Sequence, residues 1–168
     1  KFCPGPITFI LKKKKNSKIN SMVSANLNTV AIRFPKHKII RNILKNINFP
    51  LAMPSANISS SVSPVNAEDV ADEFKKKIKI ILNGGKSKIG IESTVIDLTG
   101  KPTILRPGIV EVDKIQKILK IKIATSKKNS RVISPGMLKR HYSPGIPIIL
   151  NQIPGNKTGA YITLGNKY

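Results

Sequence analysis

The sequence is poor in acidic and aromatic residues. Its 168 residues include 30 lysines and arginines against 8 aspartates and glutamates, which gives a formal net charge of +22. Aromatic residues make up only 5%, so the stacking of bases on aromatic rings has little support. The positive charge would still attract a polyanion such as RNA. Because lysines are mixed with isoleucine and asparagine throughout the chain, the lysine runs at 12–15 and 75–77 are interpreted as solvated faces.

Cysteine and histidine are scarce. The single cysteine, Cys3, cannot form an internal disulfide, and the two histidines, His37 and His141, leave too few ligands for a zinc site. This composition favours a reducing, cytoplasmic compartment. No apolar run approaches the roughly 18 residues that span a bilayer, so no membrane association is predicted.

Several catalytic signatures are also missing. HExxH, GxSxG and a clustered pair of carboxylates do not occur, so zinc-hydrolase, α/β-hydrolase and glycosidase chemistry lack support. Gly84-Gly85-Lys86-Ser87 ends like a Walker A loop. That motif needs a glycine five residues before its Gly-Lys pair, and Ile80 stands there. A hairpin turn is therefore predicted at these four residues.

Short apolar runs alternate with helical periodicity, which predicts an α/β fold with helices covering a sheet. Strands are expected at 7–11, 30–34, 51–53, 78–82, 95–98 and 103–105. Helices are expected at 37–47, where five aliphatic residues share one face, at 67–77, with Asn66 as N-cap, and at 112–119.

The pattern changes after Ile123. Residues 1–123 are predicted to form the main domain, 124–145 a linker, and 146–168 the start of a second domain. The chain begins without methionine and ends after a strand-like run, so it is interpreted as a fragment.

Small polar or cationic residues repeatedly follow apolar runs. Short side chains let a ligand approach the backbone, and their hydroxyls can bind phosphate or ribose oxygens. The leading example is Pro54-Ser55-Ala56-Asn57, which ends the apolar run 49–53 and is read as the end of a strand at a pocket. The other segments are 29–35 (TVAIRFP), 90–97 (GIESTVID) and 103–108 (TILRPG).

Together with the opening CPGPITFIL at 3–11, these segments resemble the YrdC-like threonylcarbamoyl-AMP synthase family in order and spacing. SPGMLKRHYSP at 134–144 resembles the linker of its two-domain, SUA-type members. The resemblance implies that residues 1–123 are the C-terminal portion of a YrdC-like catalytic domain, which is a twisted mixed sheet with flanking helices. It also implies that the N-terminal part, with a Lys/Arg-rich phosphate-binding motif, is missing, and that the linker leads into the truncated start of a second α/β domain.

The resemblance implies an adenylation reaction in which L-threonine, bicarbonate and ATP give threonylcarbamoyl-AMP and pyrophosphate. The product would serve N6-threonylcarbamoyladenosine formation on tRNA. Mg²⁺, entering with ATP, is the implied cofactor, and the implied partners are tRNA and the downstream tRNA threonylcarbamoyl transferase proteins. Magnesium and fixed cations can neutralise the charge on phosphate, so no general base is assigned.

The family positions imply two groups of site residues. Arg106 ends a strand and could hold phosphate bidentately, the alternative being a surface ion pair. Arg33 interrupts a buried-looking strand and needs a partner, either the threonine carboxylate or an internal carboxylate such as Asp97. Tyr142 is implied to fold over the nucleotide as a lid, the alternative being packing on a neighbouring domain. The implied ATP-binding residues are Thr29, Ser55, Ser63, Arg106 and Tyr142, and the implied L-threonine-binding residues are Arg33, Met53 and Ser93.

Two other functions stay open at this point. One is a carbamoyl-adenylating enzyme of hydrogenase maturation with the same fold, against which the linker segment argues. The other is a basic RNA-binding module without turnover, which predicts binding that weakens steeply with salt. The 168-residue piece by itself is expected to be inactive, because the implied N-terminal cations are missing.

Overall fold

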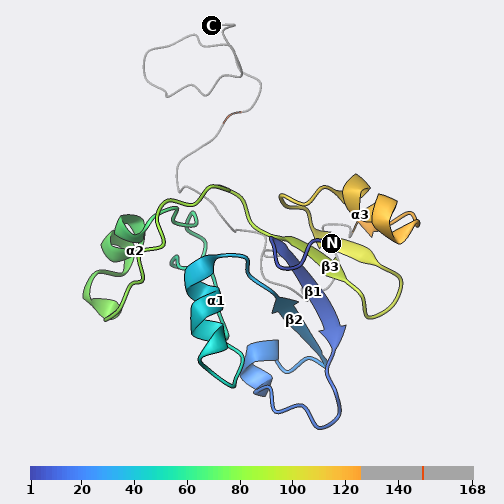
Figure 1. The fold of residues 1–168 in the computed structure, drawn as a ribbon, viewed down its shortest axis with the longest axis horizontal. Helices are drawn as coiled ribbons and strands as arrows, with labels where there is room; N and C mark the ends of the chain where they lie inside the picture. Colours follow the sequence, from blue (N-terminus) through green and yellow to red (C-terminus); the bar gives the residue numbers. More distant parts are fainter. Residues whose placement is uncertain (126–148, 150–168) are drawn as a thin grey trace, which may run out of the picture.

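Five strands form one mixed sheet in the order β2-β1-β3-β4-β5 (Figure 1). The computed structural model describes residues 1–125 and 149. β1 pairs antiparallel with β2 and parallel with β3, while β4 pairs antiparallel with β3 and parallel with β5. The bounds are β1 (Ile7–Lys12), β2 (Thr29–Arg33), β3 (Thr94–Asp97), β4 (Thr103–Arg106) and β5 (Ala124–Thr125). The α/β prediction is therefore confirmed.

The three predicted helices are present as α1 (Lys38–Lys45), α2 (Ala67–Phe74) and α3 (Val112–Leu119). Asn66 caps α2, because its side-chain oxygen accepts from the Asp69 N–H at 2.7 Å. α2 ends earlier than predicted, since Lys75 has a positive φ of 49° that the helix cannot continue through. A short 3₁₀ turn follows as η2 (Lys75–Lys77), and another, η1 (Ser21–Ser24), precedes β2.

The core lies between α3 and one face of the sheet. Strand residues alternate between the two faces, so Ile7 of β1, Ile96 of β3 and Ile104 of β4 present aliphatic side chains to the same side. All three are buried and belong to one cluster with Val110 and Ile115. Burial of these side chains against α3 fixes the central strands in place.

A buried threonine joins β3 to the segment that leads into α3. Thr94 Oγ1 donates to the Val110 carbonyl oxygen at 2.8 Å and accepts from the Val110 N–H at 3.0 Å. Thr94 is fully buried, so water cannot replace these bonds. The segment after β4 is therefore held against the start of β3 by one side chain.

Replacing Thr94 by valine should lower the free energy of unfolding by about 2 kcal/mol, because two buried backbone groups of Val110 would lose their partner. Urea unfolding followed by circular dichroism measures this change. Thr103→Val is the matched control, since Thr103 Oγ1 donates at an exposed position to the Lys101 carbonyl. Equal stability losses in the two variants would contradict the importance assigned to burial.

Two predicted strands are wrong. Residues 51–53 and 78–82 have neither helical nor strand structure. Their apolar side chains are largely exposed, with Ile80 at 78%. A strand needs a neighbouring strand to pair its backbone groups, and local apolarity does not supply one. The predicted hairpin at 84–87 is wrong for the same reason, although Gly85 does turn with a φ of 79° and its N–H donates to Asn83 Oδ1.

The end of the described sheet reaches past Ile123. Ala124 and Thr125, the first two residues of the predicted linker, pair with β4 as β5. The predicted boundaries at 123 and 145 otherwise remain predictions.

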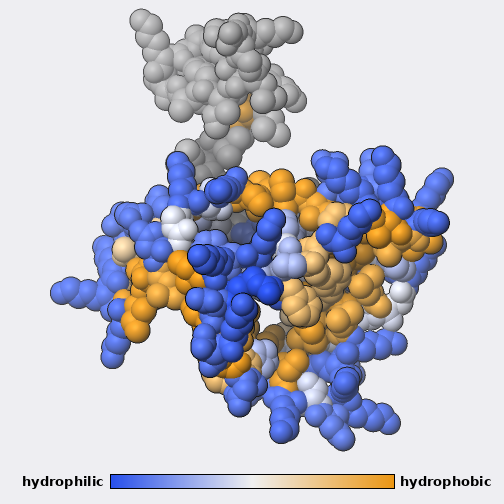
Figure 2. All heavy atoms as spheres, viewed as in Figure 1, coloured by the Kyte–Doolittle hydropathy of each residue, from blue (hydrophilic) through white to orange (hydrophobic). Residues whose placement is uncertain are grey.

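No helix among residues 1–125 is long and apolar enough to cross a membrane. Figure 2 shows hydrophilic side chains around much of the outline, with hydrophobic areas exposed between them.

Candidate functional site

Four strands bring polar residues to one end of the sheet. β1 and β3 run parallel and begin at this end, whereas β2 and β4 run antiparallel to them and finish there. Thr8 near the start of β1, Ser93 just before β3, Arg33 at the end of β2 and Arg106 at the end of β4 therefore lie at the same edge. Sequence segments more than 80 residues apart thus contribute to one place (Figure 1).

Arg106 and Ser93 form the centre of this arrangement. The Arg106 Nε and Nη2 atoms donate to the Ser93 carbonyl oxygen at 3.1 and 2.9 Å, and Nη2 also donates to Ser93 Oγ at 3.1 Å. Ser93 Oγ lies 2.8 Å from Thr8 Oγ1 in a further hydrogen bond. The implied ATP residue and the implied threonine residue are therefore in direct contact.

Glu92 extends this arrangement toward the loop before α2. Ser63 Oγ donates to Glu92 Oε1 at 2.8 Å, and Glu92 Oε2 lies 3.9 Å from Arg106 Nη2. The Arg106 side chain is only 14% exposed and that of Glu92 is 30% exposed, so the ion pair considered for Arg106 exists but is not a surface pair. We name Thr8, Ser63, Glu92, Ser93 and Arg106 the polar cluster.

The loop containing Ser63 is organised by its own side chains. Asn57 Nδ2 donates to the carbonyl oxygens of Ile58 and Ser61, and the Ile58 N–H donates to Glu73 Oε1 of α2 at 2.6 Å. Ser55, in the same loop, is exposed. Only Ser63 of the implied nucleotide hydroxyls in this loop thus joins the polar cluster.

Met53 is exposed by 60% in a stretch without regular structure. The strand that was expected to deliver Met53 and Ser55 to a pocket is absent, as described above. Their implied roles remain predictions that the fold does not explain.

Arg33 lies beside the polar cluster, but its side chain is exposed and not buried as expected. It is the register partner of Thr8, and its Nε donates to the Gly5 carbonyl at 3.4 Å. β2 is an edge strand and Arg33 is exposed, so the expectation of a charge in a buried strand is wrong. The alternative partner, Asp97, instead accepts from the Thr99 N–H.

The remaining implied ATP residues are Thr29 and Tyr142, of which the structure describes only Thr29. Thr29 begins β2 opposite Lys12, four residues from Arg33, and a strand covers about 13 Å over that length. Thr29 is therefore at the other end of the strand from the polar cluster. Tyr142 lies outside the described residues, as do His141 and the linker segment 134–144.

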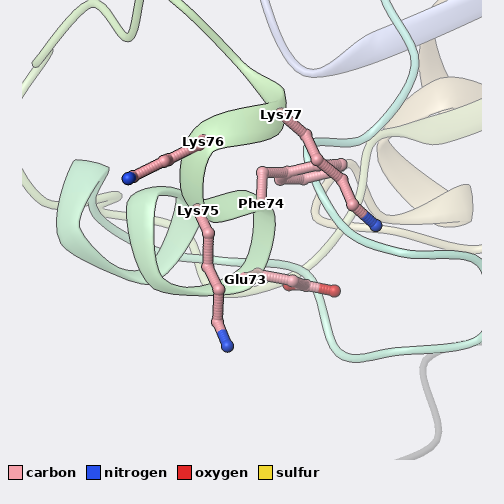
Figure 3. Close-up of a pocket in the computed structure, with 5 residues that line it drawn as sticks. All are labelled: Glu73, Phe74, Lys75, Lys76 and Lys77. Carbon is pink, nitrogen blue, oxygen red and sulfur yellow. The ribbon is translucent and has the colours of Figure 1, made fainter.

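Two hollows on the surface formed by residues 1–125 lie away from the polar cluster. One of about 690 Å³ is lined by five consecutive residues, 73–77, at the end of α2 (Figure 3). The side chains of Lys75, Lys76 and Lys77 point in three different directions, so they do not converge on a ligand (Figure 3). A smaller apolar hollow of about 170 Å³ lies where α1 packs against residues 82–84, and there His37 Nε2 lies 3.3 Å from the Gly84 carbonyl oxygen.

Sequence reasoning missed two members of the polar cluster, Thr8 and Glu92. Thr8 sits in an apolar strand that was read only as a structural element. Glu92 is one of 8 acidic residues in a strongly basic chain and directly precedes Ser93, so its rarity was the available signal.

Sequence profiles of known families place the chain among its relatives. The Sua5/YciO/YrdC profile, described as "Telomere recombination", matches residues 1–108. The chain belongs to this family. A second profile, described as the C-terminal domain of threonylcarbamoyl-AMP synthase, matches residues 110–165. The resemblance to the Sua5/YciO/YrdC family stated from the motifs is therefore confirmed.

Curated members of the family extend the match over most of this chain. The threonylcarbamoyl-AMP synthase of Pyrococcus abyssi is 40% identical over 162 residues, which are 94% of this chain and 47% of that protein. The threonylcarbamoyl-AMP synthase of Bacillus subtilis is 37% identical over 154 residues, 89% of this chain and 44% of that protein. The chain thus spans about half the length of these relatives.

Solved structures of family members share the fold. A crystal structure of Sua5 from P. abyssi complexed with L-threonine has a TM-score of 0.78 at 40% identity, covering 84% of this chain and 43% of that one. YciO of Escherichia coli has a TM-score of 0.58 at 28% identity, covering 66% of this chain and 54% of its own. The mixed sheet described above is therefore the fold of the Sua5/YciO/YrdC family.

Proposed function

We propose that this chain contributes to an L-threonylcarbamoyladenylate synthase, a nucleotidyltransferase that forms threonylcarbamoyl-AMP and pyrophosphate from L-threonine, bicarbonate and ATP. The observation that carries the proposal is that Arg106 contacts Ser93 directly and reaches Ser63 through Glu92 at one end of the sheet. The resemblance assigns two of them to ATP and one to threonine. The match of residues 110–165 to the synthase C-terminal domain favours this enzyme over a carbamoyl-adenylating one.

In this proposal the two substrates meet at the polar cluster. Arg106 is held by the Ser93 carbonyl, so its guanidinium is already oriented before a phosphate arrives. Arg33 is exposed beside Thr8, so its charge carries no desolvation penalty in the free protein. Its guanidinium can form an ion pair with the threonine carboxylate. Fixing both reactants in this way converts the attack of the carbamate oxygen on the α-phosphorus into a step between oriented groups.

Mg²⁺ is proposed to enter with ATP as part of the substrate. Residues 1–125 contain no group of three or more histidine, cysteine, aspartate and glutamate side chains that could hold a metal ion. Such residues do not fit an all-protein metal site, and magnesium is commonly held by substrate phosphates and water. No step of the proposal is assigned to a protein-bound metal.

The partners of the proposed reaction follow from its product. Threonylcarbamoyl-AMP is an activated adenylate, so a transferase that delivers its threonylcarbamoyl group to tRNA must consume it. Direct contact of this basic chain with tRNA, and a cytoplasmic location, belong to the same proposal. The net charge of +22 and the single cysteine support them.

The first test follows pyrophosphate release by the complete product of the gene in the presence of ATP, Mg²⁺ and bicarbonate. We expect release to depend on L-threonine. Serine retains a hydroxyl but lacks the methyl group, while valine replaces the hydroxyl with a methyl group. If a polar group recognises the threonine hydroxyl, valine should be used several orders of magnitude less efficiently. Equal release with and without any amino acid would reject the proposed synthase activity.

A further inference from the structure

We propose that Glu92 is a positioning residue for ATP, which acts by holding Ser63 and Arg106 in one arrangement. The proposal rests on the synthase function above, and neither the resemblance nor the comparisons assign Glu92 a role. Its two carboxylate oxygens are used separately, Oε1 by Ser63 and Oε2 by Arg106.

The contact to Ser63 fixes the direction of its hydroxyl. A carboxylate can only accept, so Ser63 must be the donor in the 2.8 Å bond to Glu92. A weaker bond from the same hydroxyl reaches Asn57 Oδ1 at 3.4 Å. With its proton directed at Glu92, Ser63 presents its lone pairs to a ligand. The ligand group that it meets is therefore a donor, such as a ribose hydroxyl, an adenine amino group or a magnesium-bound water.

Glu92 also connects two parts of the fold that regular secondary structure does not join. Ser63 lies in the stretch 46–66, which contains neither helix nor strand, whereas Arg106 ends β4. Glu92 itself is fixed by its place beside Ser93 and Thr94, whose side chain is bonded to Val110. The edge of the sheet thus holds the loop in place through one carboxylate. Binding groups need such support from a rigid element to keep their geometry.

Charge makes this position sensitive to substitution. The carboxylate lies 3.9 Å from the Arg106 guanidinium, and both side chains are more than two-thirds covered. An attraction between partly covered charges is less screened than one on an open surface. Removing Glu92 therefore releases the Ser63 hydroxyl and weakens the orientation of the guanidinium at the same time.

The test measures ATP and L-threonine binding to the complete product of the gene by titration calorimetry. Glu92→Ala should raise the dissociation constant for ATP about tenfold, because a charge-assisted hydrogen bond is lost. Glu92→Gln keeps an oxygen that can accept from Ser63 and should stay within about threefold of the wild type. The dissociation constant for L-threonine should change by less than about twofold, which general unfolding would not permit.

A double substitution tests whether Glu92 acts through Ser63. If it does, Glu92→Ala combined with Ser63→Ala should weaken ATP binding no more than the stronger single substitution. Glu111→Gln is the control for a change of charge, because Glu111 is exposed and pairs only at the surface with Lys114. Should Glu92→Ala lower the melting temperature strongly, Ser63→Ala is the second variant: it should raise the dissociation constant for ATP, and unchanged ATP binding by Ser63→Ala would overturn the positioning role.

The outcomes separate this proposal from the proposed function. Unchanged or tighter ATP binding by Glu92→Ala, or additive losses in the double variant, would overturn the positioning role. Tighter binding would instead mean that the carboxylate competes with the nucleotide phosphates. If the wild type releases no pyrophosphate with L-threonine, the synthase function fails, while the ATP titrations still decide the role of Glu92.

Discussion

Arg106→Ala is expected to reduce kcat/KM for ATP about a hundredfold in the complete product of the gene, because preorganised charge at a reacting phosphate is lost. The Arg106 side chain is 14% exposed and its guanidinium is held by the Ser93 carbonyl and hydroxyl, so its orientation is set before ATP binds. The substitution also leaves the Ser93 carbonyl without this donor. Pyrophosphate release at varied ATP concentration measures the effect.

Arg106→Lys separates charge from geometry. Lysine keeps the positive charge, but it cannot donate from two fixed positions as Nε and Nη2 do. We expect it to recover less than a tenth of the lost kcat/KM, an order-of-magnitude estimate. Filter binding of tRNA provides the second readout. An equal loss of ATP and RNA affinity in Arg106→Ala would count against the enzyme and favour a basic RNA-binding module.

Gly108→Ala is expected to destabilise the protein by about 3 kcal/mol and to displace the polar cluster. An added Cβ would lie 2.5 Å from the Glu92 carbonyl oxygen and the Thr94 nitrogen, and 2.6 Å from the Ser93 carbonyl carbon. These are backbone atoms at the start of β3, so no flexible side chain can move away. Urea unfolding gives the stability change, and ATP titration shows the displacement.

Gly100→Ala is the matched control, because a Cβ added there meets no atom within 4 Å and the residue has no positive φ. We expect its free energy of unfolding to stay within about 0.5 kcal/mol of the wild type. If Gly108→Ala were as stable as Gly100→Ala and bound ATP normally, the close packing of residues 92–94 on Gly108 would not matter for the site.

Local sequence patterns correctly predicted the helices and strands that have a clear apolar periodicity. α3 was predicted at its observed bounds, and β1, β2, β3 and β4 within one residue at each end, because their apolar runs coincide with strands that find neighbours. Residues 51–53 and 78–82 carry similar runs but pair with no strand among the described residues. Periodicity reports which side chains are apolar, and it does not report whether a partner strand lies beside them.

The candidate site shows the same division between local and distant information. The sequence by itself determined the α/β class, the family resemblance and the hydroxyl and arginine residues to consider, since these depend on composition, order and spacing along the chain. Tertiary structure decided that Arg106 contacts Ser93 directly, that Ser63 and Arg106 share Glu92, and that Thr8 joins Ser93. It also decided that Thr29 lies at the opposite end of β2 and that Arg33 is exposed. The physical reason is strand pairing, which brings residues 8, 33, 93 and 106 to one edge although no local interaction connects them.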